Sequence, residues 1–436
     1  MQQLNRINPF NRSILMKKLF IFLACLIGLN MSNHTQAQIW HNAKNDGYHI
    51  FGQGWSRSSQ NKYQRIPETL KSKLNNSGLW IGSRNCAGFY VRFRTDATNI
   101  SVRYSLTTAA TQYMYLSAYG QSGVDLYARS NDGKTFHWLA PHVGNASFGT
   151  PAIANYRNVI AQNMEGNNVC EYQLYLPNLN GISMLEVGVN TEAETFEWIE
   201  APEEDEQIVA YGSAVVAGAS ASHVGNSWTN MLGRALDTQV LNFGYATPVK
   251  LEEGMFAVLA ELKAKVFIID AMPDMINNVS NIKSGILAGV KTLRAVNQRP
   301  ILLVESPGTA DKLIRPELEA RHTAANAELR KAYDELTEAG YHNIFYMTQE
   351  EIGLTADDFL DGIDVNDLGM KHYAEAYLKK LAYIEQHKEN IPDGITDLEA
   401  TKGTGKVYDL TGRPANEKHL TKGVYIRNGK KEAISK

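Results

Sequence analysis

The sequence predicts three parts: an all-β sandwich or jelly roll, a three-layer α/β/α domain and a short β tail. Three observations lead to this prediction. Short alternating segments separated by turn residues fill residues 38–200. Unbroken apolar runs with helix-period segments between them occupy residues 207–390. Two more alternating strands lie within residues 391–436.

Length and composition support a multidomain globular protein. At 436 residues the chain is too long for one ordinary core. A formal charge of -3 supplies no electrostatic attraction to nucleic acid. The sequence has no zinc-type Cys/His spacing, and we expect neither a metal nor another cofactor.

The N-terminus has the pattern of a signal peptide, residues 1–37. Lys17 and Lys18 precede an apolar run over 19–29, which is too short for a membrane span. We expect translation to start at Met16 and cleavage to follow Ala37. The protein is therefore expected in the periplasm, at the cell surface or outside the cell, with no membrane span.

After cleavage two cysteines remain, Cys86 and Cys170, both within expected strands. An exported protein can join such a pair in a disulfide. Two buried free thiols are an equally good interpretation, and the sequence leaves both open.

The sandwich is predicted from its strands, which are expected at 89–94, 100–104, 113–116, 136–138 and 172–176. Its tryptophans are interpreted as core or interface residues, with a sugar-stacking platform as the alternative: Trp40, Trp55, Trp80 and Trp138.

An acidic segment over 201–206 marks a linker, and the pattern then changes to strands alternating with helices. Apolar strands are expected at 208–211, 240–243, 266–269, 301–304 and 344–347. Helices are expected at about 228–236, 250–263, 280–297, 316–339 and 367–388. This alternation predicts a parallel sheet covered on both faces. The final segment resembles the C-terminal sorting tails of exported Bacteroidetes proteins, and a plain β appendage is the alternative.

Two motifs carry a resemblance to a known family. Gly212-Ser213-Ala214-Val215 follows the first strand and resembles the first signature block of the SGNH/GDSL hydrolases. Gly123-Val124-Asp125-Leu126-Tyr127 resembles the Gly-x-Asp-Leu-Tyr signature of the β domain that precedes the hydrolase in one bacterial subgroup. The resemblance implies a flavodoxin-like ester hydrolase domain behind a carbohydrate-binding-like sandwich.

The residues that the resemblance assigns to ester chemistry are mostly substituted. Ala214 stands at the nucleophile position and Thr247 at the position of the oxyanion-hole glycine. Asp274 replaces the oxyanion-hole asparagine, and an ionised carboxylate accepts hydrogen bonds but donates none. Asp361 retains the triad aspartate, whereas Asp364 replaces the base histidine.

Four lost roles predict a pseudoenzyme that binds carbohydrate or acylated glycan in the former ester site, with Ser213, Asp274 and Asp364 as binding residues. Asp274 and Asp364 are expected to converge beside Asp361. An empty acidic pocket, a bound cation and an acid/base pair for glycoside chemistry are the interpretations of this cluster. An active esterase using relocated residues and an interaction subunit of an active paralogue remain alternatives. The oligomeric state is not predicted.

Overall fold

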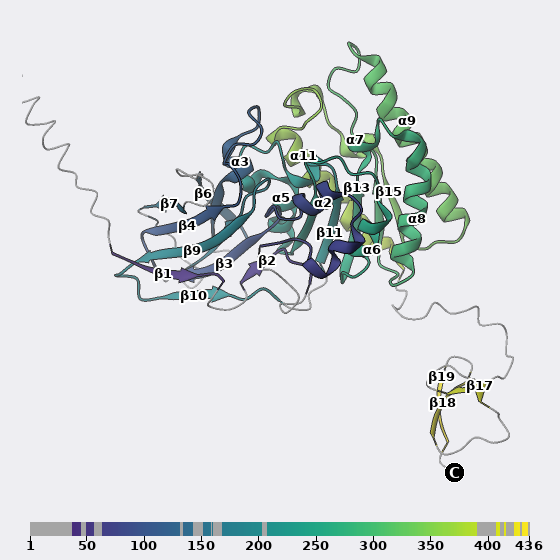
Figure 1. Ribbon diagram of the computed structural model, residues 1–436, viewed down its shortest axis with the longest axis horizontal. Helices are drawn as coiled ribbons and strands as arrows, with labels where there is room; N and C mark the ends of the chain where they lie inside the picture. Colours follow the sequence, from purple (N-terminus) through teal and green to yellow (C-terminus); the bar gives the residue numbers. More distant parts are fainter. Residues whose placement is uncertain are drawn as a thin grey trace, which may run out of the picture.

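The computed structural model describes residues 37–44, 49–55, 63–130, 134–142, 151–157, 159, 168–202 and 207–389, and four short segments between 407 and 434. It contains a β-rich N-terminal domain followed by an α/β domain with a parallel sheet, as predicted (Figure 1). Residues 1–36 of the expected signal peptide and 203–206 of the expected linker lie outside the described residues.

The N-terminal domain is a sandwich of two antiparallel sheets. One has the order β1-β9-β4-β7 and the other β10-β3-β8-β5-β6, with β2 paired to β3. The strands are β1 (Gln38–Asn42), β2 (Ile50–Phe51), β3 (Tyr90–Thr95), β4 (Ile100–Leu106), β5 (Val124–Arg129), β6 (Phe136–His142), β7 (Pro151–Tyr156), β8 (Cys170–Tyr175), β9 (Ile182–Asn190) and β10 (Phe196–Ile199). Residues of both sheets, such as Phe93 and Val102, share one core. The domain also contains a 3-10 helix, η2 (Glu68–Lys73), and the short helices α2 (Ser77–Gly82) and α3 (Ala118–Ser122).

The α/β domain has a five-stranded parallel sheet in the order β12-β11-β13-β14-β15. The strands are β11 (Gln207–Gly212), β12 (Val240–Gly244), β13 (Ala264–Asp270), β14 (Ile301–Val304) and β15 (Ile344–Met347). All six residues of β11 are buried because both faces of the sheet are covered.

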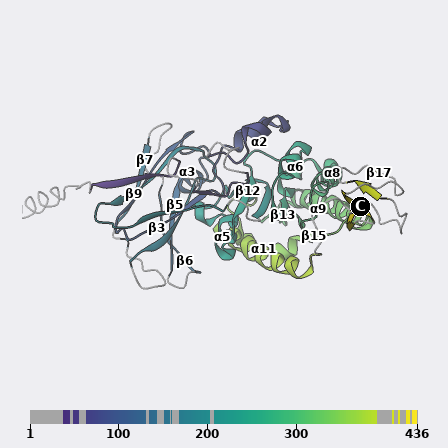
Figure 2. The same ribbon diagram turned by 90° about the horizontal axis from the view of Figure 1, so that it is seen from below.

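Helices cover the sheet on both faces, so the domain has the predicted three layers. On one face lie α6 (Glu253–Leu259), α8 (Ile282–Arg294) and α9 (Pro316–Glu338). On the other lie α5 (Trp228–Leu236) and α11 (Asp367–His387) (Figure 2). Shorter elements complete the domain: α4 (Ala214–Ala217), η3 (Val224–Asn226), α7 (Met272–Met275), η4 (Val279–Asn281), α10 (Gln349–Ile352) and η5 (Ala356–Asp358).

Two details of the sequence-based prediction are wrong. Residues 113–116 form turns and not a strand, because the buried Gln121 side chain binds the backbone groups of Tyr113 and Leu116. Cys86 lies in a loop, although Cys170 is in β8 as expected. Both cysteines are buried free thiols.

The tail contains a small antiparallel sheet in the order β17-β16-β18-β19. Its strands are β16 (Val407–Asp409), β17 (Pro414–Ala415), β18 (Gly423–Arg427) and β19 (Lys430–Ile434). None of the described helices combines the length and hydropathy that a bilayer-crossing segment needs.

Candidate functional site

The turn after β11 holds the nucleophile position. β11 ends at Gly212, where a Cβ atom would lie 1.8 Å from the Asp270 carbonyl oxygen, so only glycine allows this approach between neighbouring strands. Ser213 follows and Ala214 begins α4. The Ser213 side chain is 1% exposed and its Oγ is buried, which is at odds with its predicted role as a binding residue. The partly exposed Ala214 presents only a methyl group.

The loop after β12 holds the oxyanion-glycine position. Thr247 is exposed and its methyl group packs against α2 of the sandwich, where a Cβ on Gly78 would lie 2.5 Å from the Thr247 Cγ2 atom. Two residues later, the Val249 N–H donates a hydrogen bond to Asp274 Oδ2 (2.9 Å). The side chain at the oxyanion-asparagine position therefore acts as an acceptor.

Asp274 lies in α7, just beyond the end of β13. Burial, together with smaller contributions from the neighbouring carboxyls of Asp270, Asp364 and Glu252, raises the pKa of Asp274 to about 7 against the opposing effect of the Val249 N–H. Burial also raises the pKa of Asp270 to about 7, opposed by a hydrogen bond from the Tyr377 hydroxyl (2.8 Å). Two carboxyls at this edge of the sheet thus titrate near neutral pH.

Asp361 and Asp364 lie in the loop before α11. Asp361 Oδ1 accepts hydrogen bonds from the backbone N–H groups of Ile363 (3.0 Å) and Asp364 (2.8 Å), which fix a tight turn. Burial and, secondly, Asp361 raise the pKa of Asp364. Asp364 also raises the pKa of Asp274, so the two carboxyls interact electrostatically. Nowhere in the described part of the chain do three side chains of the His, Cys, Asp or Glu type converge as metal ligands do.

The sandwich contributes to this region through Tyr115, which the sequence analysis missed. Its pKa is raised by burial and, secondly, by the charges of Asp364 and Asp361. The residue is 61% exposed. The neighbouring Leu116 is buried and joins Ala217 and Ala219 of the α/β domain in one apolar cluster. The two tyrosines within residues 113–116 could have indicated a binding surface, but this segment was expected to form a strand.

The two domains also meet through buried polar contacts. The Asp125 carboxylate accepts hydrogen bonds from the His223 ring, from the Gly225 N–H (2.8 Å) and from Trp138 Nε1 (2.7 Å). The Trp138 ring stacks on His223 with centroids 4.5 Å apart, so this tryptophan is an interface residue. Arg65 donates to the carbonyl oxygens of Asn242 and Gly244, both at 2.7 Å.

Among the described residues checked outside the expected site, no serine–histidine pair is open to a substrate. Ser220 Oγ donates to the Val365 carbonyl oxygen at 2.6 Å. Ser306 Oγ lies 2.6 Å from His322 Nδ1, but these side chains are 0% and 2% exposed. A nucleophile needs both a base and access to its substrate, and this pair lacks access.

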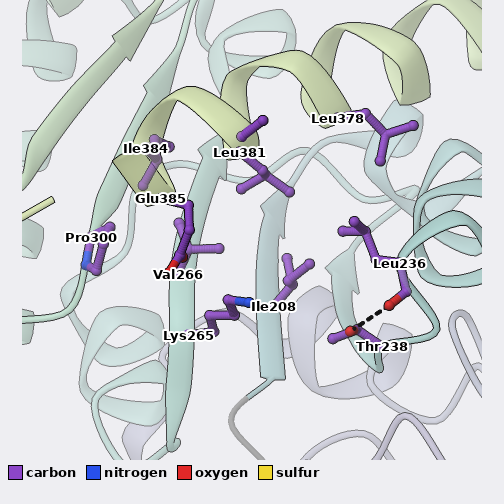
Figure 3. Close-up of a pocket in the computed structure, with 11 residues that line it drawn as sticks. Ile208, Leu236, Thr238, Lys265, Val266, Pro300, Leu378, Leu381, Ile384 and Glu385 are labelled. Carbon is purple, nitrogen blue, oxygen red and sulfur yellow. Dashed lines mark hydrogen bonds between the residues drawn. The ribbon is translucent and has the colours of Figure 1, made fainter. Parts of the chain in front are cut away.

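A separate apolar pocket of about 240 Å³ lies at the opposite, amino edge of the sheet, beneath α11 (Figure 3). Leu378, Leu381 and Ile384 of α11 line it, with Lys265 and Glu385 as its charged residues. None of the residues predicted for the ester site lines this pocket.

The fold and the carboxyl-edge site together define a two-domain protein of the ester-hydrolase type. Residues 205–382 match the GDSL-like lipase/acylhydrolase family, and residues 38–195 match the Gly-x-Asp-Leu-Tyr domain found at the N-terminus of SGNH-type esterases. Each of the two domains thus matches a family model of SGNH/GDSL-type esterases over its own residues.

Solved structures share the fold. A candidate GDSL-like lipase from Bacteroides ovatus is 22% identical, with a TM-score of 0.71 over 80% of this chain and 98% of that chain. The salicylyl-acyltransferase SsfX3 from a tetracycline biosynthetic pathway is 15% identical, with a TM-score of 0.62 over the same shares of the two chains. No curated protein matches the sequence.

Proposed function

We propose that this protein is an exported, catalytically inactive SGNH-fold protein that binds carbohydrate or acylated glycan at its former ester site. One observation carries the proposal: Asp274 Oδ2 accepts the Val249 N–H, and its ionised carboxylate has no N–H to donate where the family's chemistry requires a donor. Acyl transfer needs donors aimed at the developing oxyanion, and removing one costs on the order of 10²–10³ in rate. A carboxylate there repels that charge.

The nucleophile and base positions support the same conclusion. Ala214 has no oxygen to attack an ester, and Asp364 replaces the imidazole that would take the proton. Loss of a serine nucleophile alone costs on the order of 10⁶ in rate. The scaffold around these positions nevertheless retains the strand, turn and helix arrangement of an ester site, which suits a binding role.

The ligand class is supported by the chemistry of the site. Carboxylates accept hydrogen bonds from sugar hydroxyls, and an exposed aromatic ring offers an apolar face for stacking. Asp274, Asp364 and Tyr115 supply these two kinds of contact.

An active esterase with relocated residues is the second candidate, because a Ser306–His322 contact exists. The burial of both side chains argues against this function. Hydrolysis of p-nitrophenyl acetate distinguishes the two. We expect the full chain to give no turnover above buffer, and the Ser306→Ala variant to match it. Turnover that disappears in Ser306→Ala, Ser213→Ala or Asp364→Ala would establish an enzyme instead.

Export is part of the proposal and rests on the N-terminal Lys17 and Lys18, the apolar run and the small residue Ala37. Fractionation of the native cells, with N-terminal sequencing of the mature protein, tests it. We expect the mature chain to begin at Gln38. A cytoplasmic protein that retains residues 16–37 would contradict export.

A further inference from the structure

The apolar pocket at the amino edge of the sheet lies between the sheet and α11 (Figure 3). Its floor contains Ile208 and Val266, which are directly paired residues of the neighbouring strands β11 and β13. Its roof is the C-terminal half of α11, where Leu378, Leu381 and Ile384 repeat with the helical period and pack toward the sheet. Aliphatic side chains therefore bound the pocket on two opposite sides.

The size and lining of the pocket determine which ligand it can hold. A protein cavity of about 150 Å³ with apolar walls takes up benzene, which has six carbon atoms. On the same scale, this pocket of about 240 Å³ holds about ten carbon atoms. The neutral polar side chain of its lining, Thr238, already donates its hydroxyl proton to the Leu236 carbonyl oxygen at 3.0 Å. The lining thus favours a hydrocarbon chain over a sugar or a peptide.

A β-bulge places a cation at this pocket. Gln207 pairs with Ala264 and Ile208 pairs with Val266, so Lys265 is an extra residue of β13 without a partner in β11. Bulges change the direction of the side chain at the inserted position and are frequent next to functional sites. The Lys265 side chain extends from β13 toward β11 and lines the pocket (Figure 3).

The charge of Lys265 is not neutralised within the described part of the chain. Lys265 is exposed and forms no ion pair with a described residue. Glu385, the other charged residue of the pocket, is bonded to Lys388 at 2.9 Å. Ligand pockets combine apolar walls with a few placed polar groups, which fix the orientation of the ligand. An ammonium group beside aliphatic walls therefore suits an amphiphile with a single negative charge.

We propose that this pocket binds a medium-chain fatty acid of about eight to ten carbons. Its carboxylate would lie at Lys265, and its chain would lie between the sheet and α11. The ammonium and carboxylate groups form a charge-assisted hydrogen bond, and burial of the chain removes apolar surface of both partners from water. None of the residues predicted for the ester site lines this pocket, so the inference is independent of the proposed function. No bond is made or broken in this binding.

The test is isothermal titration calorimetry on the full chain at low ionic strength. The probes are hexanoate, octanoate, decanoate and tetradecanoate, below the concentrations at which they form micelles, together with the uncharged 1-octanol. We expect one bound molecule per chain and an affinity that rises about tenfold for each two methylene groups from hexanoate to decanoate. Tetradecanoate should bind no more tightly than decanoate, because its additional methylene groups find no room in the pocket.

Variants assign the contacts. Lys265→Met keeps an unbranched side chain without the charge and should weaken octanoate about fivefold, while 1-octanol binds as before. Lys291→Met is the matched control, because it removes an exposed lysine from α8 on the other face of the sheet. Leu381→Trp fills the pocket and should abolish binding of every probe. Ala382→Phe, at an exposed position of the lining, should do the same with less risk to folding.

Each outcome supports or overturns the inference. Octanoate and decanoate that give no binding heat, or that bind in several copies per chain, overturn it. Binding that survives in Leu381→Trp and Ala382→Phe, both shown to be folded by thermal melting, overturns the location. An unchanged affinity of Lys265→Met for octanoate overturns the carboxylate contact, and an affinity that still rises from decanoate to tetradecanoate overturns the size limit. Glycan binding at the ester site should be the same in Ala382→Phe as in the unaltered chain, so failure of this inference leaves the proposed function intact.

Discussion

The carboxylate of Asp125 in the sandwich accepts a hydrogen bond from the ring of His223 in the α/β domain. Asp125 is fully buried and belongs to the Gly-x-Asp-Leu-Tyr motif on β5. The motif therefore joins the two domains, with Trp138 stacked on the outer face of the histidine. A Cβ on Gly225 would lie 2.4 Å from the Tyr127 hydroxyl, so the last residue of the motif is fitted against the same segment.

Replacing Asp125 by alanine should destabilise the protein. The change leaves the His223 ring, the Gly225 N–H and Trp138 Nε1 without their acceptor, and a buried donor left unsatisfied costs on the order of 1–3 kcal/mol. Urea denaturation followed by tryptophan fluorescence measures the loss. Glu197→Ala, which removes an exposed carboxylate 3.9 Å from Arg94, is the control and should change stability by less than about 0.5 kcal/mol. A similar small effect of Asp125→Ala would contradict a structural role for the motif.

Restoring the four lost residues should create an esterase. The variant combines Ala214→Ser, Thr247→Gly, Asp274→Asn and Asp364→His. We expect hydrolysis of p-nitrophenyl acetate at least ~10²-fold above the unaltered chain, because a positioned base and oxyanion donors each contribute this much.

The matched control is the triple variant that keeps Ala214, which should remain inactive because it lacks a nucleophile. Equal activity in the triple and quadruple variants would show that water, and not the introduced serine, attacks the ester. No activity in a correctly folded quadruple variant would mean that further residues of the site have changed.

Stability should fall as pH rises through the range from about 4 to 7. The pKa of Asp274 is raised to about 7 in the folded protein, whereas an unfolded aspartate titrates near about 4. Between these values the folded state binds more protons than the unfolded state, so the free energy of unfolding decreases with increasing pH. Asp270, also with a pKa of about 7, contributes in the same direction.

Asp274→Asn should reduce this pH dependence, since the amide oxygen still accepts the Val249 N–H and no longer ionises. Melting temperatures between pH 4.5 and 8 measure the effect. The exposed Asp357→Asn serves as the control and should leave the slope unchanged. A variant that keeps the full slope would show that Asp274 is already ionised at low pH.

The mature protein should contain two free thiols that are unreactive in the native state. Burial raises the pKa of Cys86 to about 12 and that of Cys170 to about 11, and reactivity requires the thiolate. Titration with Ellman's reagent, without reductant, should detect no fast-reacting thiol in the folded protein. Two should react in guanidinium chloride. No reaction after unfolding would instead indicate a disulfide.

Much of the α/β domain followed from the sequence. β14 and β15 occupy the predicted residues, and α5 covers the predicted 228–236. These predictions succeed because a strand buried on both faces must be apolar throughout, and an amphipathic helix must repeat its apolar residues with the helical period. Residues 113–116 have strand-like composition, yet hydrogen bonds to the buried Gln121 side chain, five to eight residues further along the chain, hold their backbone in turns. Local propensity carries no information about such a partner.

The candidate site was predicted in part. The order of motifs along the chain placed Asp274, Asp361 and Asp364 in one region, because loops after parallel strands meet at the carboxyl edge of the sheet. Because Ser213 directly follows the first strand, it was expected to face this region as well. Neighbouring side chains after a strand point in different directions, however, and Ser213 is buried.

By itself, the sequence determined the layered fold and the functional groups present at the expected ester-site positions, since an alanine or a carboxylate has the same functional groups in any conformation. Only the tertiary structure decided which groups face each other. Asp125 binds His223, and Arg65 binds the carbonyl oxygens of Asn242 and Gly244, across a domain boundary. Contacts between residues so distant in sequence depend on how the two domains pack, and no local pattern encodes that packing.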